Sequence, residues 1–153
     1  APIATQTIIV NAARRKAAAA SREQDLQIRV NEAEVRIYTD SLEKITEELV
    51  DNAFKFSSSG SPVEVQSQVD GDTLLLTVRD SGRGLTPEQL NSIGAYMQFE
   101  RALYEQQGLG LGLIIAKRLT ELHGGQMTLD SRPTQGTMVY VRLPLAHSTN
   151  GKH

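Results

Sequence analysis

Residues 40–57 carry the pattern that most constrains the fold of this chain. Counted at about 100° per residue, apolar side chains recur on one face of a helix over this stretch. These side chains are Leu42, Ile45, Leu49, Ala53 and Phe56. At the start of the stretch Asp40 can cap the free N–H groups while Glu43 reaches back, as in a capping box. The pattern predicts a long amphipathic helix whose apolar face lies in a hydrophobic core.

A second stripe on the same helix is polar and lies roughly a quarter-turn away from the apolar face. It consists of Glu48, Asn52 and Lys55, at the i, i+4, i+7 spacing that aligns side chains along a helix. The ordinary interpretation of such a stripe is a solvated helix surface, because charged residues are mostly exposed. Two glycine-rich segments further along the chain favour a binding site instead.

Composition narrows the class of protein. The chain has 153 residues, of which 39% are hydrophobic and 22% charged, as in a single soluble globular domain. The net charge of −2 gives no general attraction for nucleic acid or an anionic membrane. The lack of cysteine excludes disulfides, thiolate metal sites and thiol catalysis. No apolar run approaches the roughly 20 residues of a membrane span, so we expect a cytoplasmic domain, whether or not a longer parent protein is membrane-anchored.

The first 25 residues are predicted to lie outside the folded domain. Residues 8–20 are rich in alanine and basic side chains, which favours an exposed helix. Residues 21–25 are typical of a polar linker. We therefore assign residues 1–25 to a helix and linker that come from a preceding domain or an arbitrary boundary. Residues 26–145 form the predicted folded domain, and residues 146–153 a disordered tail.

Period-two alternation predicts six strands in the remaining chain. They are residues 26–30, 35–38, 63–69, 74–78, 126–131 and 137–143. Asp70-Gly71 is a strong tight-turn signal between the two central segments, and a second amphipathic helix is predicted over residues 114–122. Because most strand pairs are close in sequence, the order predicts an α+β fold. This fold is a two-layer α/β sandwich, with a mixed, mostly antiparallel sheet and helices packed on one face.

Each glycine-rich segment has features that a nucleotide would require. In Asp80-Ser81-Gly82-Arg83-Gly84 the glycines remove side chains that would block a ring, and the carboxylate can accept a hydrogen bond from an adenine amino group. The run Gly108-Leu109-Gly110-Leu111-Gly112-Leu113 precedes the second helix, so its backbone N–H groups can meet phosphates at a helix N-terminus. No strand leads into this run and no Gly-Lys-Ser/Thr occurs, so neither a Rossmann fold nor a P-loop is predicted.

The polar stripe adds a metal ligand and a positive charge to what the two loops supply. Asn52 offers a neutral oxygen to Mg²⁺, a cation that prefers oxygen ligands and is usually bound together with phosphates. Lys55 supplies positive charge near the phosphates or the ribose. Taken together, the three segments predict a site for ATP with Mg²⁺.

These segments resemble a known set of motifs. The run from Glu48 through Asn52 to Phe56 is similar to the N box of sensor histidine kinases, and the two glycine segments are similar to their two glycine boxes. Residues 96–101 resemble the F box, with Tyr96 and Phe99 as its aromatic pair. The resemblance covers residues 26–145. It extends to the wider GHKL superfamily, with its Bergerat fold, which is shared with gyrase, the large heat-shock chaperones and the mismatch-repair ATPase.

The resemblance implies a role for each matching residue. Asn52 would be the Mg²⁺ ligand, Lys55 a phosphate contact, Phe56 an adenine-side contact and Asp80 the adenine acceptor. Residues 92–107 would form an ATP lid in which Arg101 contacts the terminal phosphate. The remaining implied nucleotide contacts are Gly82, Gly84, Tyr96, Phe99, Gly108, Leu109, Gly110, Leu111, Gly112 and Thr137.

The resemblance also implies a reaction and its partners. The domain would transfer the γ-phosphate of ATP to a histidine on a dimerisation domain of the same parent protein, with a response regulator downstream. The histidines of this chain are His123, His147 and His153, and none is followed by the pattern of a phosphoacceptor helix. We therefore expect a catalytic fragment that binds nucleotide but does not autophosphorylate alone.

Glu48 departs from the resemblance, because sensor kinases often carry Asn at this position. In hydrolytic relatives a Glu there polarises the attacking water, whereas in a kinase Glu48 would orient the incoming histidine or take its proton. Two alternatives therefore stay open. One is a GHKL-type ATP hydrolase or an anti-sigma-like serine kinase, and the other is a non-catalytic interaction module that keeps only the fold.

Overall fold

A single five-stranded sheet forms the frame of the molecule. The computed structural model describes residues 1–82, 88, 91, 112–132 and 134–146. Across the sheet, the strands follow the order β2 (Leu26–Val30), β4 (Val63–Asp70), β5 (Thr73–Asp80), β7 (Gly136–Pro144) and β6 (Gln126–Arg132). The β2–β4 pair is parallel and the other neighbouring pairs are antiparallel. The predicted mixed, mostly antiparallel sheet is confirmed.

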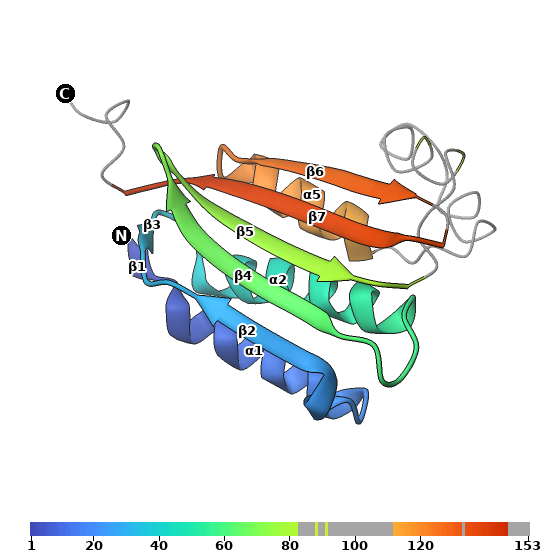
Figure 1. Ribbon diagram of the computed structural model, residues 1–153. Helices are drawn as coiled ribbons and strands as arrows, with labels where there is room; N and C mark the ends of the chain where they lie inside the picture. The colour runs from blue at the N-terminus through green and yellow to red at the C-terminus, as the bar shows by residue number, and fades with distance from the viewer. Residues whose placement is uncertain (83–87, 89–90, 92–111, 133, 147–153) are drawn as a thin grey trace.

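Helices cover one face of this sheet (Figure 1). They are α1 (Gln6–Ala19), α2 (Thr39–Lys55) and α5 (Gly112–Leu122), and α2 contacts both of the others as well as β4 and β5. Alternate side chains of the strands point into this layer and are buried, whereas Gln66 and Arg79 on the open face are exposed. The two-layer α/β sandwich is therefore confirmed. None of the helices in the described part is long and apolar enough to cross a membrane.

The predicted strand over residues 35–38 is shorter than expected. β3 consists of Glu34–Val35 alone and pairs antiparallel with β1 (Ile3–Ala4) in a separate two-stranded sheet. The chain then turns toward α2, and Tyr38 is 73% exposed. The folded part continues to Ala146, whose N–H donates to the Glu34 carbonyl oxygen at 2.9 Å. The rest of the predicted tail lies outside the described residues.

The start of the predicted long helix is also corrected. α2 begins at Thr39, its N-cap residue is Tyr38, and no side chain caps it. The predicted capping box is wrong, because Asp40 already lies within the first helical turn. A carboxylate in that turn still favours the helix through its partial positive charge. The predicted apolar face is buried, since Leu42 and Ile45 are fully inaccessible and Leu49 is 1% exposed.

The prediction that the N-terminal helix is exposed is wrong. Ile9, Ala12, Ala13 and Ala17 of α1 are fully buried, and the helix packs against α2. Their spacing forms a stripe along one face, but alanine is so weakly apolar that the stripe is inconspicuous in the sequence. At the start of α1, the Glu32 carboxylate accepts hydrogen bonds from the N–H groups of Thr5, Gln6 and Ala33.

The predicted polar linker after α1 is ordered and partly buried. A 3₁₀ helix, η1 (Glu23–Asp25), joins α1 to β2. Both Arg22 and Asp25 are 6% exposed, and their side chains form an ion pair at 2.7 Å. The composition of the segment is polar, but these two charges neutralise each other inside the fold.

We expect Ile9→Ala to lower the free energy of unfolding by about 2–5 kcal/mol, because the substitution leaves a cavity in the core. Asn11→Ala, at an exposed position of the same helix, should change stability by less than about 0.5 kcal/mol. Urea denaturation of both variants measures the difference. Equal stabilities would contradict the integration of α1 into the core.

Candidate functional site

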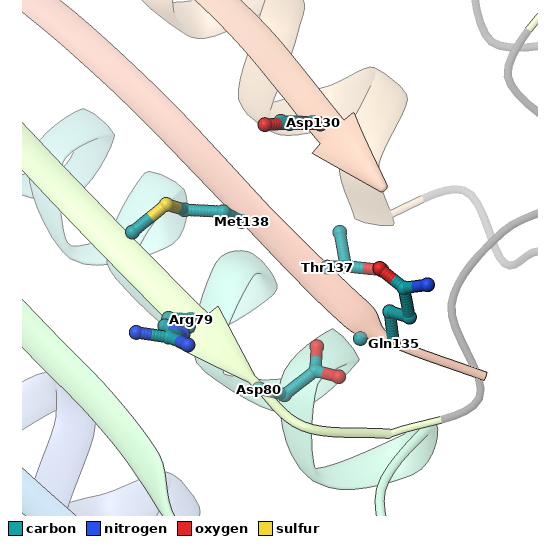
Figure 2. Close-up of a pocket in the computed structure, with 7 residues that line it drawn as sticks. Arg79, Asp80, Asp130, Gln135, Thr137 and Met138 are labelled. Carbon is teal, nitrogen blue, oxygen red and sulfur yellow. The ribbon is translucent and has the colours of Figure 1, made fainter. Parts of the chain in front are cut away.

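Asp80 is a buried carboxylate at the end of the central strand β5. It is 4% exposed and lies opposite Thr137 of β7 in the strand register, as Figure 2 shows. Burial raises the pKa of the Asp80 carboxyl, while N–H groups of Gly82 and Thr137 and the charge of Arg22 act in the opposite direction. The Gly82 N–H donates to Asp80 Oδ1 at 2.8 Å. The carboxylate is therefore held in a fixed orientation as an acceptor.

A pair of hydroxyl groups lies beside this carboxylate. Ser131 Oγ and Thr137 Oγ1 are 2.7 Å apart, and Ser131 Oγ also donates to the Gly136 carbonyl oxygen at 3.1 Å. A side chain at Gly136 would collide with the Asp80 carbonyl oxygen, and its φ of +91° also favours glycine. Ser131 and Gly136 are not among the site residues predicted from the sequence. The register of the last hairpin could have revealed both, because Ser131 pairs with Thr137.

The predicted polar stripe lies on α2. The side chain of Glu48 is 16% exposed and Glu48 Oε2 is 2.6 Å from Lys44 Nζ. This hydrogen bond raises the pKa of the Lys44 ammonium, although burial opposes it. One turn further, Asn52 is half-buried, and Lys55 is exposed with its Nζ 5.6 Å from the centroid of the Phe56 ring. The stripe therefore presents an acid, an amide and an ammonium in a row.

Two glycines bring the predicted loops against this stripe. A Cβ at Gly82 would collide with the carbonyl oxygen of Phe56, which follows the last turn of α2. A Cβ at Gly112 would collide with the carboxylate of Glu48. Asn52 lies four residues after Glu48 and four before Phe56, about one helical turn from each. The ends of both glycine segments thus meet α2 on either side of Asn52.

The other predicted site residues are not placed. Gly84, Tyr96, Phe99 and Arg101 lie outside the described residues, as do Gly108, Leu109, Gly110 and Leu111. Of the glycines in the two segments, Gly82 and Gly112 are the ones that the structure describes. The contacts of these two glycines are therefore the observations that place both segments against α2.

A hollow of about 360 Å³ opens at the end of β5 and the start of β7 (Figure 2). Its lining includes Asp80 and Thr137 but no residue of α2. Strand alternation places Arg79, Asp130 and Met138 on the sheet face opposite the helices. This hollow therefore adjoins the predicted site without coinciding with it, and the glycine contacts locate the site better.

The donor set suits a nucleotide with its metal. The Asn52 amide is a neutral oxygen donor of the kind that Mg²⁺ accepts, and the exposed ammonium of Lys55 lies three residues further along α2. Among the residues that the structure describes, no three His, Cys, Asp or Glu side chains gather to hold a metal ion. Phosphate oxygens and water are the remaining ligands that Mg²⁺ commonly takes in nucleotide sites.

Comparisons of the sequence and of the structure with known proteins point to the same family. Residues 37–147 match the family model described as "Histidine kinase-, DNA gyrase B-, and HSP90-like ATPase". The chain is similar to histidine protein kinase DivJ of Caulobacter vibrioides, with 39% identity over 115 residues. It is also similar to alginate biosynthesis sensor protein KinB of Pseudomonas aeruginosa, with 32% identity over 127 residues.

These matches cover 74% and 82% of this chain but only 19% and 21% of the two relatives. The chain thus spans about a fifth of the length of these curated relatives. Among solved structures, it is similar to mycobacterial sensor histidine kinase MprB at 27% identity and a TM-score of 0.77. That match covers 95% of this chain and 97% of the other.

Proposed function

Because the chain belongs to the histidine kinase-, DNA gyrase B- and HSP90-like ATPase family, we propose that it is the ATP-binding catalytic domain of a two-component sensor histidine kinase. The proposed reaction transfers the γ-phosphate of Mg-ATP to a histidine on the dimerisation domain of a longer parent protein. A response regulator would then receive the phosphoryl group, and the domain would work in the cytoplasm. The contact of Gly82 and Gly112 with α2 on either side of Asn52 is the observation that carries this proposal.

Adenine would be recognised at the end of β5 and the start of β7. The Asp80 carboxylate is buried and oriented by the Gly82 N–H, so its free lone pairs can accept a hydrogen bond from the adenine amino group. The Thr137 hydroxyl lies on the neighbouring strand and is held by Ser131. Guanine carries a carbonyl oxygen where adenine has its amino group, and a carboxylate repels that oxygen. The site would therefore prefer ATP to GTP.

The phosphates would extend from this pocket along the polar stripe of α2. Asn52 and the phosphate oxygens would hold Mg²⁺, which neutralises the negative charge that develops during phosphoryl transfer. Lys55 adds positive charge from the next turn. The N-terminus of α5 begins at Gly112, where the helix carries partial positive charge for an anion. Phosphoryl transfer depends mainly on such positioning and charge, with little covalent work for the protein.

Glu48 would act on the group that attacks the phosphate. Its carboxylate lies against the start of α5 and is fixed by Lys44. From this place it can orient an incoming histidine or accept its proton. The same placement favours one alternative, an ATP hydrolase of the same superfamily or an anti-sigma-like serine kinase, because a carboxylate there can equally polarise a water or a hydroxyl group.

Asn52→Ala should abolish binding of Mg-ATP while the domain stays folded, because the substitution removes the proposed metal ligand. Asp51→Ala, at the exposed neighbouring residue, is the matched control and should bind as the unmodified domain does. Titration calorimetry measures both affinities, and circular dichroism checks the fold. Equal Mg-ATP affinity in the Asn52 variant would refute the assignment.

Asp80→Asn should reduce the preference for ATP over GTP by about tenfold or more, since a hydrogen bond to a charged group contributes about 1.5–3 kcal/mol. Asn has both a donor and an acceptor, so it can pair with either base. Competition between the two nucleotides measures the ratio. An unchanged ratio would show that Asp80 does not read the base.

The raised pKa of Asp80 adds a pH dependence to the same prediction. A carboxyl whose pKa is raised in the folded state takes up a proton above the ordinary value of about 3.9. Its buried charge therefore costs stability at neutral pH, and this cost disappears as the pH falls through the folded-state pKa. Over that interval the unmodified domain should lose ATP affinity more steeply than Asp80→Asn, because the variant shares every other titration, including that of ATP. Titration calorimetry at several pH values measures both profiles, and parallel profiles would contradict a role for the Asp80 charge.

Glu48→Gln separates the kinase from the hydrolase. In the kinase, the unmodified domain releases little phosphate alone but phosphorylates the helical phosphoacceptor domain of its parent supplied in trans. The variant then slows this transfer by about 10²-fold or more, at unchanged ATP affinity. Rapid phosphate release by the unmodified domain without any histidine acceptor, lost in the variant, would support the hydrolase instead.

A further inference from the structure

Arg22 is a buried charge that the site described above does not use. It lies between α1 and η1 and is 6% exposed. Charged side chains are almost never so buried unless they are paired, and Arg22 Nε donates to Asp25 Oδ2 at 2.7 Å. The remaining donors of the guanidinium group reach across to a distant part of the chain.

These donors meet the C-terminal end of α2. Arg22 Nη1 donates to the carbonyl oxygens of Phe54 and Ser57, each at 3.1 Å. Arg22 Nη2 donates to the carbonyl oxygens of Ser58 and Ser61 at 2.7 and 2.9 Å. The guanidinium carbon also lies 4.8 Å from the centroid of the Phe54 ring. One side chain thus holds the last turn of α2 and the loop that follows it.

The C-terminal end of α2 needs hydrogen-bond donors from outside the helix. The last four carbonyl groups of a helix accept no hydrogen bond within the helix, and they carry partial negative charge. The end of α2 has no left-handed residue immediately after it, because Phe56 has φ −100° and the first such glycine is Gly60 at φ +97°. The guanidinium group of Arg22 satisfies one of the four, the Phe54 carbonyl, and it also holds carbonyl groups of the loop that takes the place of a glycine cap.

Asp25 holds the same loop through a further hydrogen bond. Its Oδ2 atom accepts the Gly60 N–H at 2.9 Å as well as the bond from Arg22. These two interactions hold the pKa of the Asp25 carboxyl below its usual range, although burial opposes them. The ion pair is therefore a clamp of two side chains, Arg22 and Asp25, on residues 54–61.

The clamped segment forms one wall of the proposed nucleotide site. This segment contains Lys55 and Phe56. The Phe56 carbonyl oxygen occupies the space that a side chain at Gly82 would need. Through Gly82 this contact continues to Asp80, whose pKa is raised by burial, with the charge of Arg22 acting in the opposite direction. A shift at the end of α2 would therefore move the phosphate side and the adenine side of the site together.

We propose that Arg22 is a positioning residue for nucleotide binding, which acts through α2 by fixing the turn that carries Lys55 and Phe56 against Gly82. This inference rests on the proposed function. It assigns to the segment between α1 and β2 a role in the affinity of the site, although no atom of that segment need touch the nucleotide. The planar fork of arginine is required, since the acceptors lie on several sides of one group.

The test compares Arg22→Lys with Ile9→Ala in the same chain. Arg22→Lys keeps the charge but loses the fork, and we expect its affinity for the Mg²⁺ complex of a non-hydrolysable ATP analogue to fall by about tenfold, as misplacement of binding groups would cause. Ile9→Ala destabilises α1 without touching the clamp, so its affinity should be unchanged once the folded fraction is taken into account. Titration calorimetry well below the unfolding transition gives both values.

A spectroscopic measurement separates positioning from general loss of stability. In the nucleotide-free Arg22→Lys variant, amide resonances of Lys55, Phe56 and Gly82 should move, whereas in Ile9→Ala they should stay in place. If Arg22→Lys does not fold, Asp25→Asn serves as the milder variant, with a smaller loss of affinity in the same direction.

The outcomes distinguish this inference from the proposed function. Failure of the unmodified domain to bind the analogue would overturn the proposed function. Binding by the unmodified domain, together with equal affinity in a folded clamp variant, would overturn the role of Arg22 alone. An equal loss of affinity in Ile9→Ala would show that the effect is one of stability and would also overturn it.

Discussion

Burial of the apolar face of α2 is the constraint on which the rest of the structure depends. Leu42, Ile45 and Leu49 are almost completely inaccessible, and burying each such side chain contributes about 1.5–3 kcal/mol. Because α1 and α5 pack on either side of α2, the helix cannot rotate about its axis without exposing this face. Its polar stripe is thereby fixed in direction, so a packing requirement also orients the functional groups.

Close backbone approach is the second requirement, and glycine satisfies it where strands and helices meet. Gly82 fits against the end of α2 and Gly136 against the end of β5, and any side chain at either position would collide with a backbone carbonyl group. At Gly112 the obstacle is a side chain, the carboxylate of Glu48. The first two positions therefore tolerate substitution least. The buried clamp of Arg22 and Asp25 fixes the same end of α2 by hydrogen bonds to its backbone and to the following loop.

The sequence predicted the sheet and the two main helices well because their signals are local. Alternation identified β4 and β5, and helical spacing identified α2 and α5. The predictions were wrong where contacts between residues far apart in the sequence determine which side chains are buried. Arg22 and Asp25 are polar by composition, yet they are buried because they pair with each other and with distant backbone groups. Arg22 donates to carbonyl groups, and Asp25 accepts the Gly60 N–H, more than thirty residues away. For the site, the sequence named Asp80, Asn52 and Gly112, whereas Ser131, which holds the Thr137 hydroxyl, follows only from the register of the last hairpin.

The central claim is that one nucleotide bridges α2, the end of β5 and the start of α5. The most direct measurement is an NMR titration of the ¹⁵N-labelled domain with the Mg²⁺ complex of a non-hydrolysable ATP analogue. The account predicts that the largest amide shifts occur in residues 48–56, 80–82 and 137 and at Gly112. Shifts confined to the open face of the sheet, around Arg29 and Thr77, with Asn52 and Asp80 unmoved, would contradict it.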